Sequence, residues 1–202
     1  MSYAAAVRRA AVAYTSPGGG KQIRRFGPKD ANGFPTVFHV VAVARTPSCE
    51  AAWYRVQLPI RPNGSTGWVH AWSVAVAPLH TRIVIHVRAA RLELYRGRHI
   101  VLRSAISPGA PDTPTPIGRF YIRERFVLTD PNGPYGPAAL GTSAFSPVLK
   151  SWKQGGPVGI HGTDDPTAIG HPVSHGCIRL PNDAMKRLFA STPAGTPVII
   201  AA

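Results

Sequence analysis

The residues of this chain that are best suited to covalent chemistry lie in its last quarter. His161 and His175 both precede Cys177, which is one of two cysteines in the 202-residue sequence. A free thiol has a pKa of ~8.5 and is only slightly ionised at neutral pH, so it needs a base to act as a nucleophile. An imidazole can take the thiol proton and later deliver it to a leaving amine. These residue types therefore predict acyl transfer by a cysteine and a histidine.

Glycines accompany both members of this pair. Gly176 comes directly before Cys177, where the missing side chain lets the backbone bend and present amide N–H groups to a developing oxyanion. Gly162 follows His161 and lets the chain turn there, which leaves a backbone carbonyl to hold the imidazole in one tautomer. We expect this hydrogen bond to replace the acidic third member of a catalytic triad.

The spacing leaves open which histidine is the base. In an extended strand, residues two apart share a face, so His175 could meet Cys177 directly, whereas His161 would come from a neighbouring strand. A zinc site built from His161, His171, His175 and Cys177 is an alternative, because histidine and cysteine are zinc ligands. The lack of paired cysteines and the glycine beside Cys177 disfavour it. We therefore expect no metal site.

The elements that position these residues are expected to be mostly β. The 20 glycines and 21 prolines are spread along the chain without a repeat, which favours short strands and turns over long helices. Between residues 10 and 77 we expect five or so short strands, among them 37–43 and 53–58, that form a small amino-terminal barrel. Trp53 and Trp68 are expected to fill its core. The segment 78–80 is the expected boundary, so the two domains are residues 1–78 and 79–202.

The second domain is predicted to be β-rich with one helix. Apolar residues alternate with period 2 from Ile83 onward, as in half-buried strands. Residues 128–147 are rich in Gly, Pro and small polar residues, and we expect a long loop there. Tyr135 and Tyr121 are the aromatic candidates for substrate contact, although either ring could instead pack inside the domain. Asn182 is the expected N-cap of the helix after the cysteine.

Several motifs together resemble the YkuD-type L,D-transpeptidase catalytic domain. They are the first histidine followed by Ser-His-Gly-Cys, the Leu-x-Asn-Asp-Ala helix start, the Gly-Thr-Pro-Val ending, the Thr-Pro-rich stretch at 113–120, and the Tyr-Gly and Leu-Gly pairs at 135–136 and 140–141. The resemblance covers about Thr81 to Ile200, and the motifs are highly specific in combination. It implies a β-rich catalytic fold.

The resemblance also implies a role for each residue of the site. Cys177 is the nucleophile, His161 accepts and donates the proton, and His175 is a third catalytic candidate that shapes the pocket and the oxyanion site. Arg179 stands where many members of the family carry asparagine, and its guanidinium suits a carboxylate. The implied substrate-binding residues are Gly162, Ser174, Gly176, Arg179 and Tyr135.

By this resemblance, Cys177 is acylated by a tetrapeptide stem of peptidoglycan after its third residue, and the terminal D-amino acid is released. A second stem's amine or a lipoprotein lysine then attacks the thioester and forms a cross-link. Attack by water would make the enzyme an L,D-carboxypeptidase instead, and the residues do not separate the two outcomes. Carbapenem-type β-lactams are the expected inhibitors. No metal or organic cofactor is required.

The amino-terminal part resembles a bacterial Src-homology-3-like domain in the runs 53–56 and 67–69. Such a domain implies binding to the wall or to a peptide. If only this binding were retained, the chain would be a non-catalytic wall-binding protein. The presence of both His161 and Cys177 argues against that alternative, because a binding module has no use for the pair.

The charge and hydropathy of the chain limit its partners. The net charge of +14 predicts attraction to polyanions such as an anionic wall polymer. No nucleic-acid-binding motif is visible, so we expect no nucleic-acid partner. No apolar run approaches the ~18 residues of a membrane span. Arg8 and Arg9 interrupt the apolar start, so no export signal is evident. We nevertheless expect the protein in the cell envelope or at the extracellular face, in the periplasm or the cell wall.

Overall fold

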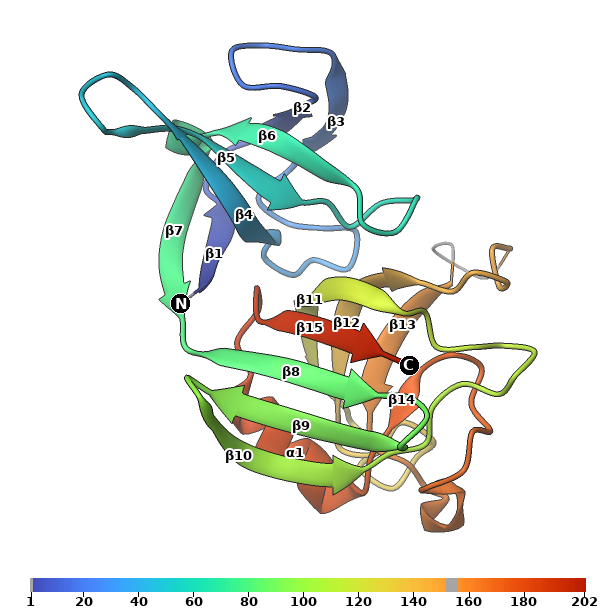
Figure 1. Cartoon of the computed structure of the whole chain (residues 1–202). Helices are drawn as coiled ribbons and strands as arrows, with labels where there is room; N and C mark the ends of the chain where they lie inside the picture. Colours follow the sequence, from blue (N-terminus) through green and yellow to red (C-terminus); the bar gives the residue numbers. More distant parts are fainter. Residues whose placement is uncertain (1, 152–155) are drawn as a thin grey trace. The chain divides into compact units, whose positions relative to one another are not determined.

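A computed structural model of the chain describes residues 2–151 and 156–202. It divides into two compact units, Met1–Leu79 and His80–Ala202. The division falls next to the boundary that the sequence indicates, where β7 gives way to β8 (Figure 1). Each unit forms its own sheet and its own apolar cluster.

The described part of the amino-terminal unit is one curled antiparallel sheet in the order β3-β2-β6-β5-β4-β1-β7. A short 3-10 helix, η1 (Ala71–Ser73), joins β6 to β7. The alanine-rich start of the chain is a central strand because its small residues are buried against their neighbours: Ala5 is paired with Phe38, and both are fully buried. The strands are β1 (Ser2–Val7), β2 (Ala11–Tyr14), β3 (Gln22–Phe26), β4 (Val37–Arg45), β5 (Ala51–Gln57), β6 (Thr66–His70) and β7 (Val74–Leu79).

The two tryptophans expected in this core lie elsewhere. Trp53 and Trp68 are partly exposed, and the buried cluster is built instead from smaller apolar side chains around Phe38. The Trp53 ring stacks on the His70 ring with 3.6 Å between centroids. Cys49, which follows β4, is exposed and is not part of a disulfide. The prediction that Trp53 and Trp68 fill the core is therefore wrong.

The described part of the carboxy-terminal unit contains an eight-stranded sheet in the order β10-β9-β8-β15-β11-β12-β13-β14. Two neighbouring pairs are parallel, β15 with β8 and β13 with β14, and the others are antiparallel. The elements are β8 (Thr81–His86), β9 (Arg91–Arg96), β10 (His99–Ala105), β11 (Gly118–Val127), β12 (Ala138–Phe145), β13 (Pro157–His161), the 3-10 helix η3 (Pro166–Ala168), β14 (Ile178–Arg179), α1 (Asn182–Ser191) and β15 (Pro197–Ala201).

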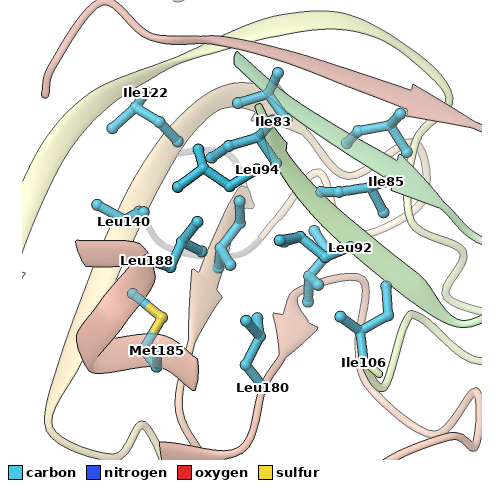
Figure 2. Close-up of a cluster of buried hydrophobic side chains, with 14 of the residues drawn as sticks. Ile83, Ile85, Leu92, Leu94, Ile106, Ile122, Leu140, Leu180, Met185 and Leu188 are labelled. Carbon is cyan, nitrogen blue, oxygen red and sulfur yellow. The ribbon is translucent and has the colours of Figure 1, made fainter. Parts of the chain in front are cut away.

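The helix α1 covers this sheet with its apolar face. Met185 and Leu188 are fully buried and lie among the leucine and isoleucine side chains of the sheet (Figure 2). Burying each of them contributes about 1.5–3 kcal/mol. Asn182 is the first helical residue, and Pro181 occupies the N-cap position without a side-chain cap. The predicted helix is confirmed, but Asn182 is not its N-cap, because its side chain bonds elsewhere.

The segment expected to be one long loop contains a central strand. β12 lies within residues 128–147 and pairs with both β11 and β13. Its alanine, glycine, serine and threonine residues have weak or mixed strand preferences, but most of them are buried between two partners. Ladder hydrogen bonds and burial override such preferences, so the connection between β11 and β12 is confined to residues 128–137. Among the described residues, no helix has the length and apolarity needed to span a membrane.

Candidate active site

The pairing of β13 with β14 brings the histidine and the cysteine together. The two strands are parallel, with Ile160 opposite Ile178 and His161 opposite Arg179. Cys177 comes just before β14, and its Sγ accepts a hydrogen bond from the N–H of Gly159 at 3.4 Å. Gly159 lies two residues before His161, and residues two apart in a strand share a face. His161 and Cys177 are therefore diagonal neighbours across one strand pair.

His161 is held in one tautomer by its own backbone. Its Nδ1 lies 2.6 Å from the carbonyl oxygen of Gly162, and a carbonyl can only accept, so Nδ1 carries the proton. The Nε2 lone pair is then available as a base. The side chain is 5% exposed, and burial lowers the pKa of His161 to about 4, against the raising effect of the Gly162 hydrogen bond. The ring is therefore neutral at physiological pH.

Cys177 is also neutral in the resting protein. Burial raises the pKa of the thiol, and this effect outweighs the Gly159 hydrogen bond and the positive charge of Arg179, which both lower it. A neutral thiol beside a neutral imidazole forms no resting ion pair.

The turn before the cysteine is built by Gly176 and Ser174. Gly176 has φ +108, a conformation that favours glycine. The Ser174 hydroxyl donates to the carbonyl of Cys177 at 2.5 Å and accepts from the N–H of Gly176 at 3.1 Å. Ser174 is 1% exposed and its hydroxyl is used inside the turn. This corrects its predicted role: it shapes the turn and does not present itself to a substrate.

This turn also changes the position expected for His175. The segment leading to Cys177 is a bend with a positive φ at Gly176, so it is not an extended strand. Residues 175 and 177 therefore do not share a face by strand alternation, and His175 is exposed to solvent. The geometry favours His161, held beside β14, as the base.

The loop at 113–117, which precedes β11, is hydrogen-bonded to this turn. The Thr115 hydroxyl donates to the Gly176 carbonyl at 3.0 Å and accepts from the N–H of Gly109 at 2.8 Å. Thr113 donates to the Ser174 carbonyl at 3.0 Å. Sequence reasoning recognised this Thr-Pro stretch as a motif but gave it no function. Its two threonines position the backbone around the nucleophile.

The two tyrosines proposed for substrate contact have different positions. Tyr135 is 57% exposed, and its ring packs edge-on against the His161 ring with 4.9 Å between centroids. Tyr121 is fully buried, so of its two predicted roles the structure supports packing inside the domain and excludes substrate contact. Tyr135 forms part of the exposed wall beside the base.

Arg179 brings a positive charge to the site. It lies opposite His161 and shares a face with Cys177. Its charge lowers the pKa of both groups. Within residues 2–151 and 156–202, its Nε is buried and has no hydrogen-bond partner. The same described residues contain no group of three or more His, Cys, Asp or Glu side chains that could hold a metal ion.

The chain was compared with known proteins. The family model of the YkuD L,D-transpeptidase catalytic domain matches residues 80–200. The YkuD L,D-transpeptidases of Bacillus licheniformis and Bacillus subtilis are each 37% identical to the chain, over 119 and 123 residues. These matches cover 59% and 61% of this chain, and 64% and 66% of the relatives, so the chain spans less than two thirds of their length.

A solved structure shares the fold. An L,D-transpeptidase from Mycobacterium smegmatis superimposes with a TM-score of 0.50 at 18% identity, over 82% of this chain and 90% of that chain. At this identity the likeness concerns the fold alone.

Proposed function

This chain belongs to the YkuD family of L,D-transpeptidase catalytic domains, and on that premise we propose that it is a cysteine acyltransferase acting on the stem peptides of peptidoglycan. One observation carries the proposal: the β13–β14 pair sets Cys177 beside Gly159, two residues from a buried histidine whose Nδ1 is bonded to the Gly162 carbonyl. Such a pair can activate a thiol without an acidic residue.

The proposed reaction has two halves. Sγ of Cys177 attacks the carbonyl carbon of the third stem residue while Nε2 of His161 takes the thiol proton, which gives a tetrahedral oxyanion. Collapse breaks the amide bond, and His161 protonates the released amine of the D-amino acid, leaving a thioester. An amine of a second stem then attacks this thioester, His161 accepts its proton, and the new amide forms as the thiol is restored. Water in place of the amine gives hydrolysis.

Two side chains are proposed to recognise the donor stem. Arg179 brings a positive charge close to both His161 and Cys177, which suits a carboxylate of the stem. Tyr135 is exposed beside the His161 ring and provides an apolar wall for the peptide. Carbapenem-type β-lactams are proposed to acylate Cys177, because their ring carbonyl is an amide that the same nucleophile can attack.

Incubation with purified muropeptides tests this function. We expect dimers and released D-alanine from the intact protein, and neither from Cys177→Ala. Cys49→Ala is the matched control, because Cys49 is exposed in the other unit, and it should keep full activity. Release of D-alanine without dimers would support the carboxypeptidase alternative. Binding without any product would leave only a wall-binding protein and would overturn the proposal.

The amino-terminal unit is proposed to be Src-homology-3-like and to bind the wall. The proposal is supported by a surface aromatic group in which His70 stacks on Trp53 and Trp72, with Trp72 65% exposed. Exposed apolar groups of this kind mark binding surfaces. The unit also carries nine lysine and arginine residues against two acidic residues, which suits an anionic polymer. Because both proposed activities act on the wall, we propose that the protein works in the cell envelope, in the periplasm or the wall.

A further inference from the structure

One peptide group beside the base is bonded at both ends. The carbonyl of Gly162 accepts from Nδ1 of His161 at 2.6 Å, and the N–H of Thr163, which belongs to the same peptide group, donates to Oδ1 of Asn182 at 2.9 Å. Asn182 is the first residue of α1. The hydrogen bonds therefore connect Asn182 to His161 through one planar peptide group. A rotation of this group that moves its N–H also moves its carbonyl.

Two glycines pack tightly against the side chain of Asn182. A Cβ added to Gly162 or to Gly136 would collide with Oδ1 of Asn182. Gly136 has φ +63 and its Cα lies against Gly162. Two glycines from different loops are thus packed on the asparagine. Because Gly136 follows Tyr135, the same contact seats the tyrosine beside the base.

Asn182 is itself fixed with respect to the nucleophile. It follows Cys177 by five residues, and within that short link the N–H of Leu180 donates to the carbonyl of His161 at 2.8 Å. The segment that follows the cysteine and the first residue of α1 are therefore both hydrogen-bonded to the segment that contains His161. This arrangement locates the base from two sides.

We propose that Asn182 is a positioning residue for catalysis, which orients and polarises the Gly162–Thr163 peptide group so that His161 stays in its Nδ1–H tautomer with Nε2 towards the sulfur. Hydrogen bonds that follow one another in a series strengthen each other. The hydrogen bond that Asn182 accepts from the N–H of Thr163 therefore makes the Gly162 carbonyl a better acceptor for the His161 ring. The site then has four members, namely thiol, imidazole, peptide group and amide. This inference rests on the proposed roles of Cys177 and His161.

Three variants in a Cys49→Ser background test this inference, and Cys49→Ser removes the exposed second thiol. Asn182→Ala removes the acceptor, whereas Asn182→Asp keeps an oxygen at the same place. Asp183→Ala is the matched control, because Asp183 is the next residue of the same helix turn and its side chain is 95% exposed. Thermal unfolding and circular dichroism establish that each variant is folded before it is compared.

The first readout is the tautomer of His161, followed by nitrogen-15 NMR of histidine-labelled protein and assigned by the signal lost in His161→Gln. We expect the Nδ1–H form in the parent, in Asn182→Asp and in Asp183→Ala. In Asn182→Ala we expect a mixture with the Nε2–H form. An Asn182→Ala spectrum identical to that of the parent would overturn the inference.

The second readout is the rate at which iodoacetamide alkylates Cys177, followed by intact mass. This rate needs no peptidoglycan substrate, so it separates failure of the inference from failure of the proposed function. We expect a loss of about tenfold to a hundredfold in Asn182→Ala, since small misplacements of a catalytic group have effects of this size, and recovery in Asn182→Asp. An equal loss in Asp183→Ala, or no recovery in Asn182→Asp, would show a structural role only.

Discussion

At the scale of single residues, burial decides the protonation of the reactive pair. It lowers the pKa of His161 to about 4 and raises the pKa of the Cys177 thiol. At a pH above the pKa of His161 and below that of Cys177, the thiol keeps its proton and Nε2 of His161 is free to accept it. Once His161 takes up a second proton at low pH, it can no longer act as a base.

We therefore predict a wide pH range for acylation of Cys177 by a carbapenem. The rate should stay level from neutral pH down to about pH 5 and decline as the pH approaches 4, where the pKa of His161 lies. Intact mass of the Cys49→Ser protein follows the adduct, and Cys177→Ala should form none. A decline centred near the ordinary histidine pKa of ~6.5 would contradict the assignment of the buried His161 as the base.

At the scale of elements, the site is a junction between two strands and the turns that end them. The turn at Ser174–Cys177 is held by the Ser174 hydroxyl and by Thr115 from another loop. Its geometry depends on the positive φ of Gly176. The alternative of an extended segment would remove the bend that sets the thiol beside Gly159.

Gly176→Ala should therefore slow the acylation of Cys177, and its loss of unfolding free energy should be no larger than that of a control glycine substitution. A Cβ at Gly176 meets nothing closer than 3.6 Å, so its cost comes from the backbone conformation and is expected to be about 1–3 kcal/mol of unfolding free energy. Gly170→Ala is the control, because Gly170 has φ +93 and open space around it. Urea unfolding should show similar losses for both variants. Only Gly176→Ala should also slow carbapenem acylation at a temperature where both are folded, and equal acylation rates would contradict the role of this turn.

At the scale of the whole molecule, the positive charge is divided evenly between the two units. The amino-terminal unit has nine basic and two acidic residues, and the carboxy-terminal unit has fourteen and seven. An excess of seven in each half gives a positive potential along the entire chain, and such potentials attract polyanions over a range set by the salt concentration.

Binding to isolated cell walls should accordingly depend on salt. We expect co-sedimentation with walls that retain their anionic polymers, and release as the salt rises from 0.05 to about 0.5 M, where screening acts within a few ångströms. Walls stripped of those polymers should retain much less protein at low salt. Binding that is independent of both salt and anionic polymer would contradict a charge-driven interaction and would point to the aromatic group around Trp72.

Local patterns predicted much of this protein. The mostly β fold, the helix after the cysteine and the carbonyl partner of His161 were all predicted from residue types and spacing, and the structure confirms each of them. These features depend on neighbours in the sequence. A glycine beside a histidine allows the turn that offers its carbonyl, and the spacing of Met185 and Leu188 defines one helix face.

The sequence by itself determined which side chains are proposed to carry the chemistry, because a thiol, an imidazole and the glycines between them have few other uses in that order. Only the tertiary structure decided how they meet. The parallel pairing of β13 with β14 favours His161 over His175 as the base. Asn182 was expected to cap the helix, but in the structure its side chain accepts a hydrogen bond from the N–H of Thr163. The position of β12 inside the sheet has the same physical reason. Strand pairing and burial depend on which distant segments become neighbours, and a local sequence pattern does not contain that information.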